Sequence, residues 1–250
     1  MPTSSRNFLD VDFDAEPTDQ ILARIEAVGA DSPYQYLITP NVDHLVRLHR
    51  RASDVPGLAD AYRQADFCVC DSKVLARLAK WKGVDLPVLP GSDLTEILLK
   101  SVVVAGDKIA IVGCDPETAD DLRARFPQLK IVQHRPPMGL LANASARTAA
   151  AQFVAREQAR FTFICVGSPQ QELIAAEVAS MPEARGLALC VGAGLDFVTN
   201  KQKRAPLIAR KLGLEWAHRL ATNPRRLWRR YLVEGPAIFL MAYRWQKTAA

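Results

Sequence analysis

The sequence lacks any apolar run long enough to cross a membrane. A spanning helix needs about 18 apolar residues with few or no charges, and the best apolar stretches are interrupted by Lys100 in one case and by Glu234 in another. Residues 1–7 also lack the apolar core of a secretory signal peptide. We therefore expect a cytoplasmic protein that, where it meets a membrane, lies on the surface of that membrane.

Cysteine is scarce, and its pattern excludes two common structural roles. The chain has five cysteines, an odd number, and none of them has C-x-x-C spacing. This argues against a disulfide framework and against a zinc site. Each cysteine lies in an apolar, strand-like run, as buried free thiols do: Cys68, Cys70, Cys114, Cys165 and Cys190. A reducing compartment is expected.

Candidate metal ligands are also sparse. Asp10, Asp12 and Asp14 form two overlapping D-x-D pairs, a pattern with which some enzymes that use sugar nucleotides hold a divalent metal. These aspartates lie on an expected edge strand near the N-terminus, where simple alternation of polar and apolar residues is enough to explain them. The four histidines show no ligand spacing. We expect no metal site.

Charge is distributed unevenly along the chain. Residues 201–250 carry 12 Lys and Arg against 2 Asp and Glu, a net of +10, whereas residues 1–200 carry a net of −5. A mildly acidic body thus bears a strongly basic tail, which implies an anionic partner at that end: phosphate, nucleic acid or lipid headgroups. We divide the chain into a body over residues 1–200 and a basic appendage over residues 201–250.

Short apolar runs alternate with helical periodicity through the body. The runs predicted as strands are Tyr34–Thr39, Phe67–Cys70, Lys108–Val112, Lys130–Gln133, Phe161–Val166 and Leu187–Val191. The predicted helices between and beside them are Val42–Arg51, Lys73–Trp81, Asp93–Val103, Glu117–Phe126, Ala144–Glu157 and Pro169–Ser180. A further strand near Phe8–Phe13 and a helix over Thr18–Val28 complete the body. This alternation predicts an α/β fold, a Rossmann-like parallel sheet with helices on both faces.

The appendage is predicted to be helical, and its role is open. Asn223-Pro224 suits a helix start. At 100° per residue the arginines 225, 226, 229 and 230 share one arc, and Leu227, Trp228, Tyr231 and Leu232 share the opposite arc. Such a helix could lie in the interface of an anionic membrane, or its apolar arc could pack on the body. Gly235-Pro236 ends it, and an apolar segment over Ala237–Trp245 follows.

Polar residues follow the first two core strands, where ligands of open parallel sheets bind. Asn41 could be a helix N-cap, which leaves Thr39 at the strand end unexplained. Asp71 or Ser72 could cap the helix that begins near Lys73. Alternatively, Asp71 is a carboxylate at the carboxyl edge of the sheet that accepts a proton. The helix N-terminus would lower the pKa of Asp71, whereas a useful base needs a pKa closer to neutral. Burial would therefore have to offset the effect of the helix.

Three further loops are candidates. Gly91, in Pro90-Gly91-Ser92-Asp93, could turn free N–H groups toward a phosphate. Ser168, Pro169 and Gln171 match a capping box at a helix start, which does not prevent Gln171 from facing the cleft. The segment from Gly192 to Asp196 lets a nucleotide approach the backbone, although it fails as a dinucleotide fingerprint because the third glycine position holds a phenylalanine.

Taken together, these segments resemble the WecG/TagA/CpsF glycosyltransferase family. The likeness spans roughly residues 8–230 and rests on the order and spacing of short markers. These are Thr39-Pro40-Asn41, Ala65-Asp66 with Asp71, Pro90 to Leu94, Gly167 to Glu172, Val191 to Gly194, Arg204-Ala205-Pro206, and Glu215-Trp216 with Arg219, Leu220 and Pro224.

The resemblance implies an inverting, metal-independent transfer of a sugar from a UDP-sugar, with no cofactor, to an acceptor linked to polyprenyl diphosphate. It implies work on exopolysaccharide or cell-envelope polysaccharide at the inner face of the membrane. Asp71 matches the general base, and Thr39, Asn41 and Gln171 match polar pocket residues. Donor contacts are implied near Gly91, Ser168, Pro169, Gly192, Asp196 and Arg204. Arg219, Arg226 and Arg229 match arginines of a lid that meets the membrane.

The sequence departs from the family pattern at two places. Ser72 stands where glycine is usual, and Leu86–Pro90 lacks the arginine often found there, which marks a difference in sugar or phosphate contacts.

Two other function classes are open. A nucleic-acid-binding protein would also explain the basic tail, but the acidic body argues against it. A nicotinamide-dependent oxidoreductase is disfavoured by the missing glycine fingerprint. The tail could also support a homo-oligomer, depending on where it docks.

Overall fold

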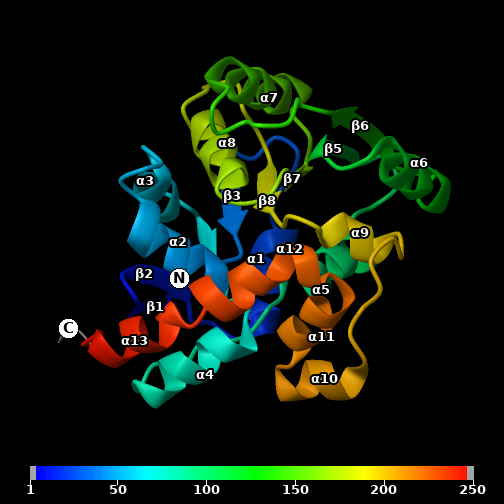
Figure 1. Cartoon of the computed structure of the whole chain (residues 1–250). Helices are drawn as coiled ribbons and strands as arrows, with labels where there is room; N and C mark the ends of the chain where they lie inside the picture. Colours follow the sequence, from blue (N-terminus) through cyan, green and yellow to red (C-terminus); the bar gives the residue numbers. More distant parts are fainter. Residues whose placement is uncertain (1–3, 247–250) are drawn as a thin grey trace.

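Six parallel strands form the central sheet, in the order β4-β3-β8-β7-β5-β6 (Figure 1). The computed structural model describes residues 4–246. The strands are β3 (Gln35–Ile38), β4 (Phe67–Cys68), β5 (Lys108–Gly113), β6 (Lys130–His134), β7 (Phe161–Cys165) and β8 (Leu187–Cys190). Each lies within its predicted run or extends one residue beyond it. The predicted α/β fold with a parallel sheet is confirmed.

The strand order decides where a ligand can bind. The chain passes from β3 outward to β4 on one side of the sheet and from β5 outward to β6 on the other. Such a reversal opens a crevice at the carboxyl ends of the strands. β8, the last strand, lies between β3 and β7, and its residue Cys190 is paired with both Ile38 and Ile164. The segments that follow β3, β7 and β8 therefore emerge side by side.

Helices cover both faces of the sheet. They are α1 (Thr18–Glu26), α2 (Val42–Arg51), α3 (Leu58–Arg63), α4 (Lys73–Trp81), α5 (Gly91–Ile97) with its π-helical continuation η1 (Leu98–Val102), α6 (Pro116–Arg125), α7 (Ala144–Glu157), α8 (Gln170–Ala179) and α9 (Gly194–Val198). Alternation along β3 divides the core, since Leu37 packs in one cluster with Ile21 of α1, and Ile38 packs in the other with Leu45 of α2. The short α3 and α9 were not predicted, because so few residues show no helical period.

The N-terminal segment differs from the prediction. Where one strand was expected over Phe8–Phe13, two strands, β1 (Ser5–Phe8) and β2 (Val11–Asp14), form a separate antiparallel pair. Leu9 and Asp10 reverse the chain in the left-handed region, with φ of 52° and 57°. Two-residue turns of this kind usually carry Asn-Gly, Asp-Gly or Gly-Gly. Because Leu9-Asp10 matches none of these pairs, the sequence gives no clear signal of the hairpin.

The residues after Asn200 form a helical appendage along one side of the body, orange to red in Figure 1. Its elements are α10 (Leu207–Leu212), α11 (Glu215–Thr222), α12 (Pro224–Trp228), the π-helix η2 (Arg229–Glu234) and α13 (Ala237–Arg244). The described part of the appendage, up to residue 246, contains helices and no strand, as predicted. The last four residues of the predicted appendage lie outside the described residues.

The appendage helix that begins at Asn223-Pro224 departs from the predicted helical wheel. The N-cap and first residue are as predicted, but from Arg229 on the backbone is π-helical, so steps of 100° no longer apply. Leu227 is buried, whereas Trp228 and Leu232 of the same predicted arc are 52% and 56% exposed. The expected apolar arc is therefore divided between buried and exposed positions.

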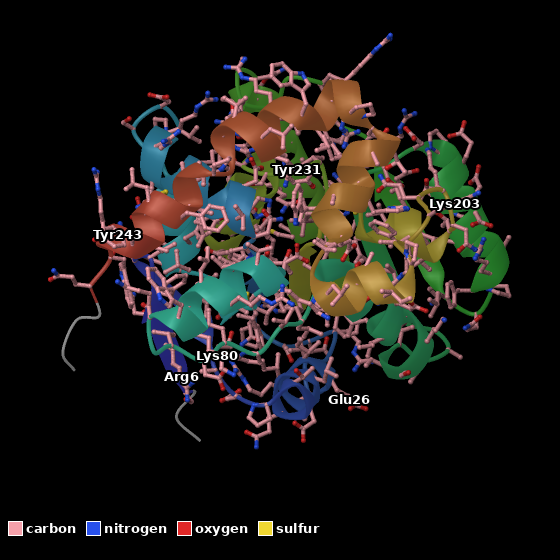
Figure 2. All side chains as sticks on the ribbon, turned by 60° about the horizontal axis from the view of Figure 1, so that its bottom comes forward. Arg6, Glu26, Lys80, Lys203, Tyr231 and Tyr243 are labelled. Carbon is pink, nitrogen blue, oxygen red and sulfur yellow. The ribbon has the colours of Figure 1, made fainter. Side chains whose placement is uncertain are left out.

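The last helix, α13, is part of the hydrophobic core. Ile238 and Ala242 are buried in the cluster that also holds Ile38 of β3. The ring of Trp245 meets the ring of Phe8 edge-on, with 5.1 Å between centroids. Figure 2 shows Tyr243 at the outer edge of this region. Among the residues that the structure describes, no helix has both the length and the apolar character to cross a bilayer.

Gly186→Ala tests the tight entry to β8. Gly186 has φ of +78°, and a Cβ there would lie 2.2 Å from the carbonyl oxygen of Ala159. Left-handed backbone costs alanine about 1–2 kcal/mol, and overpacking adds about 1–3 kcal/mol. We expect the free energy of unfolding in urea to fall by about 3 kcal/mol or more. Gly83→Ala is the matched control, with φ of +76° and open space around it. Equal losses in the two variants would contradict the packing argument.

Candidate active site

Two cavities lie at the carboxyl edge of the sheet. Cavity 1, of about 560 Å³, lies between the body and the appendage. Its polar lining includes Asn41, Asp43, Asp71, Asp93, Arg210, Glu215, Arg219 and Arg230. Cavity 2, of about 270 Å³, lies at the ends of β5, β7 and β8. Its lining includes Cys114, Asp115, Gly167, Gly192, Asp196 and Arg226. The sequence therefore brings its candidate residues to two neighbouring sites.

Asp71 is a partly buried carboxylate on the wall of cavity 1. Its Oδ1 accepts a hydrogen bond from the backbone N–H of Gly91 at 2.7 Å, and its Oδ2 accepts one from Nδ2 of Asn41 at 3.3 Å. Burial raises the pKa of Asp71 to about 6, although these hydrogen bonds and nearby Arg219 oppose the shift. The group is therefore poised to accept a proton close to neutral pH.

Helix α4 is capped by Ser72 and not by Asp71. Ser72 is the N-cap of α4, and its hydroxyl oxygen accepts a hydrogen bond from the N–H of Leu75 at 3.3 Å. The carboxylate of Asp71 is thus not used by the helix. Gly91, which was expected to offer a free N–H to a phosphate, instead donates that N–H to Asp71.

Asn41 combines the two roles that its sequence position left open. Its Oδ1 caps α2 by accepting hydrogen bonds from the N–H groups of Asp43 and His44, at 3.1 and 3.3 Å. Its Nδ2 is then directed to Asp71. Thr39 is buried, and its hydroxyl donates to the carbonyl oxygen of Cys190 at 2.9 Å. Thr39 therefore ties the end of β3 to the end of β8.

Gln171 is buried and faces inward, so the predicted capping box is wrong. Helix α8 begins at Gln170 with no side-chain cap. The side-chain amide nitrogen Nε2 of Gln171 donates to Glu172 and to the carbonyl oxygen of Cys190, at 3.0 and 3.3 Å. Its Oε1 accepts a hydrogen bond from the N–H of Gly192 at 3.1 Å. The side chain of Gln171 is thus bonded to its neighbour in α8 and to the end of β8, and not to Ser168.

Cavity 2 holds the glycine segment and Asp196. Gly192 has φ of +53°, a conformation that favours glycine, and lines the cavity beside Gly167. Asp196 is half-buried, and burial raises its pKa, with Asp115 adding to the rise. Ser168 and Pro169 belong to the loop that forms this wall, but the lining residues of that loop are Val166 and Gly167. A carboxylate and a wall lined by glycine in one small cavity suit a polar ligand with hydroxyl groups.

The appendage arginines fall into different environments. Arg219 lines cavity 1 and lies 5.1 Å above the ring of Phe197, and its Nε is buried without a hydrogen-bond partner. Arg226 lines cavity 2. Arg229 lines neither of these cavities and forms an ion pair with Glu234 at 3.2 Å. Arg204 is paired with Asp93 and, at 2.7 Å, with Glu96, so it fastens the start of the appendage to α5.

Arg210 and Arg230 are cavity residues that the sequence did not single out. Nη2 of Arg210 lies 3.2 Å from Asp93, and Nε of Arg230 lies 3.3 Å from Asp43. Both arginines reach from the appendage to a carboxylate in the first turn of a body helix. The basic tail signals cations of this kind, but their individual partners depend on how the tail docks.

The acidic N-terminal motif has a structural use. Asp14 is buried, forms an ion pair with Arg24 at 2.8 Å and accepts a hydrogen bond from the N–H of Cys68 at 2.7 Å. Asp12 accepts a hydrogen bond from Asn7 at 2.8 Å. Over residues 4–246, no group of three or more His, Cys, Asp and Glu side chains is arranged to hold a metal ion.

Comparison with known families identifies one family that this chain matches. Residues 6–250 match the family model described as the glycosyl transferase WecG/TagA/CpsF family. The match covers nearly the whole chain and includes the body, both cavities and the appendage. Of the three function classes that the sequence left open, the match favours a glycosyltransferase over a nucleic-acid-binding protein or a nicotinamide-dependent oxidoreductase.

Asp71→Asn should stabilise the fold at alkaline pH. Because the pKa of Asp71 is raised from 3.8 to about 6 on folding, stability falls as the pH rises through this range and stays lower above it. At about 1.4 kcal/mol per pKa unit, the buried carboxylate lowers the free energy of unfolding by roughly 3 kcal/mol at pH 8. Urea unfolding at pH 5 and pH 8 should show a larger gain from the substitution at pH 8. A gain that is equal at both pH values would contradict the shift.

Proposed function

The chain belongs to the WecG/TagA/CpsF glycosyltransferase family, and we propose that it transfers a sugar from a UDP-sugar to an acceptor linked to polyprenyl diphosphate. Membership makes the chain a transferase of cell-envelope polysaccharide synthesis. The proposal assigns the nucleotide to cavity 2 and the acceptor to cavity 1. The transferred sugar is a hexose or an N-acetylhexosamine.

The observation that carries this proposal is the raised pKa of Asp71, to about 6, on the wall of cavity 1. Asp71 takes the proton of the acceptor hydroxyl while the oxygen attacks the anomeric carbon. The bond from that carbon to the UDP oxygen breaks, and UDP leaves with the electron pair. A single displacement of this kind inverts the anomeric configuration. The N–H of Gly91 and the amide of Asn41 hold the carboxylate in place for it.

Cavity 2 has the groups that a departing nucleotide needs. Arg226 supplies positive charge, the segment at Gly192 allows close approach of the backbone, and Asp196 can accept hydrogen bonds from ribose hydroxyls. Arg219 is placed beside Asp71 in cavity 1. We assign the stabilisation of the leaving diphosphate to these arginines and not to a metal ion.

Cavity 1 suits an acceptor with a charged head and an apolar chain. Asp71, Arg210 and Arg230 are among its polar lining residues, and its apolar lining residues include Trp216, Tyr231, Leu232, Ile238 and Phe239. Figure 2 shows Tyr231 near the middle of the face that the appendage covers. A diphosphate can bind among the arginines while a prenyl chain leaves past the aromatic side chains.

The appendage also presents the apolar surface that membrane contact requires. Large apolar side chains exposed on the surface are concentrated there: Ile208, Leu212, Leu214, Trp216, Trp228, Leu232, Val233, Phe239, Leu240 and Tyr243. Large exposed apolar patches mark interaction sites, so this concentration of exposed apolar side chains favours a contact surface, and the excess of basic residues after residue 200 favours an anionic one. We propose that the appendage lies on the inner face of the cell membrane, where its lipid-linked acceptor resides.

Asp71→Asn should abolish most of the turnover while the fold is kept. Loss of a general base costs roughly 10²- to 10⁴-fold, so UDP release from a panel of UDP-sugars with a polyprenyl-diphosphate acceptor should drop by that factor. In the wild type, kcat/KM should fall as the pH drops below about 6, because Asp71 becomes protonated. Asp60→Asn is the control for loss of a carboxylate. Turnover of Asp71→Asn within twofold of the wild type would remove Asp71 from the mechanism.

Substituting Val233 and Leu240 by glutamate should release the protein from anionic vesicles. Both side chains are about half exposed, at 55% and 49%, and neither is among the residues that line cavity 1. Insertion of each apolar side chain is worth about 1.5 kcal/mol or more, so the affinity for phosphatidylglycerol vesicles in a sedimentation assay should fall at least tenfold. Met138→Glu, at a 98% exposed position between β6 and α7, is the control. Equal loss in the control would show that the appendage is not the contact surface.

A further inference from the structure

One carboxylate oxygen of Asp43 forms ion pairs with an arginine of the body and with an arginine of the appendage. Asp43 is buried in the first turn of α2. Its Oδ2 accepts a hydrogen bond from Nη2 of Arg47 at 2.7 Å and lies 3.3 Å from Nε of Arg230. Arg47 belongs to α2, whereas Arg230 belongs to η2 of the appendage. The carboxylate therefore joins the two parts of the chain at the rim of cavity 1.

Arg47 extends this contact to the loop between β7 and α8. Its Nη1 donates a hydrogen bond to the carbonyl oxygen of Ser168 at 2.6 Å. Over residues 4–246, no hydrogen bond or ion pair joins Arg230 to this loop directly. The route from Arg230 to the loop therefore passes through Asp43 and Arg47.

The same loop shapes cavity 2. Three residues after Ser168, the side chain of Gln171 accepts the N–H of Gly192, which lines that cavity. Gly167, next to Ser168, lines it as well. A shift of the Ser168 carbonyl would therefore move one wall of cavity 2 and the residue that orients another.

The strength of the two ion pairs of Asp43 depends on how much solvent reaches them. The side chains of Arg47 and Arg230 are 25% and 31% exposed, and that of Asp43 is 9% exposed. His44 lies beside both arginines, and burial, followed by the charges of Arg230 and Arg47, lowers its pKa to about 3. His44 is thus neutral at physiological pH and does not compete for the carboxylate of Asp43.

We propose that Asp43 is a positioning residue that couples docking of the appendage over cavity 1 to the shape of cavity 2. When η2 docks, it covers Asp43 and Arg47, and their interactions strengthen as the local dielectric falls. Arg47 then holds the Ser168 carbonyl and the loop behind it. Resting on the proposed function, which assigns the nucleotide to cavity 2, this coupling makes nucleotide binding and appendage docking favour each other, as linkage requires.

Hydrogen exchange of the full chain without ligand tests the coupling itself. Arg230→Met removes the charge and keeps an unbranched apolar stem. We expect faster amide exchange in η2 and also in residues 167–173, which Arg230 does not contact. Arg225→Met, an exposed arginine of the same appendage, should leave both segments unchanged, and Arg230→Lys should restore part of the protection. Faster exchange confined to the appendage would overturn the proposal.

Affinity for UDP, measured by calorimetry, tests the consequence. Arg230→Met and Asp43→Asn should each weaken UDP binding about fivefold or more, and the double variant should be no weaker than the weaker single variant, because both act through one contact. Unchanged affinity, or effects that multiply, would contradict the coupling. A wild type that fails to bind UDP would refute the proposed function, whereas the exchange experiment would still decide whether Asp43 connects the appendage to the loop.

Discussion

The site depends on the cost of keeping the carboxylate of Asp71 away from bulk water. Burial raises its pKa to about 6, and the N–H of Gly91 and the amide of Asn41 recover only part of that cost. The balance leaves a group that is ionised at neutral pH and close to the pKa at which a carboxylate is an effective base. The surrounding structure, from the cap of α2 to the start of α5, holds the partners that set this balance.

The appendage completes the site that the sheet begins. Cavity 1 has one wall from the body and another from α11, η2 and α13, so it exists only when the two parts are docked. Docking is secured by burial of Ile238 and Ala242 in the core and by ion pairs between tail arginines and carboxylates of α2 and α5. Removal of the appendage would expose both this apolar surface and Asp71. The same segment therefore covers the carboxylate that we propose as the base.

Much of the body could be predicted because local signals agree with the fold there. Helices α2, α4 and α7 have the predicted bounds, since Asn41, Ser72 and Asn143 cap the points at which their periodicity begins. The strands follow from apolar runs that only a covered parallel sheet can bury. The position of Asp71 at the cleft follows from the rule that ligands bind at the carboxyl ends of such strands.

What could not be predicted depends on contacts between distant segments. The capping box at Ser168 was wrong because Gln171 finds better-placed partners after β8, about twenty residues along the chain. The π-helix of η2 invalidates a wheel drawn at 100° per residue. Arg230 has no sequence feature that distinguishes it from Arg229, and only docking pairs it with Asp43.

The pKa of Asp71 is the most direct test of its assignment as the general base. A carbon-13 carboxyl titration of aspartate-labelled protein, with the Asp71 signal identified by its loss in Asp71→Asn, gives this pKa in the folded chain. We expect a midpoint near 6. A midpoint at or below about 4, the ordinary value for an aspartate, would show that the carboxylate is solvated and would contradict its role as the base.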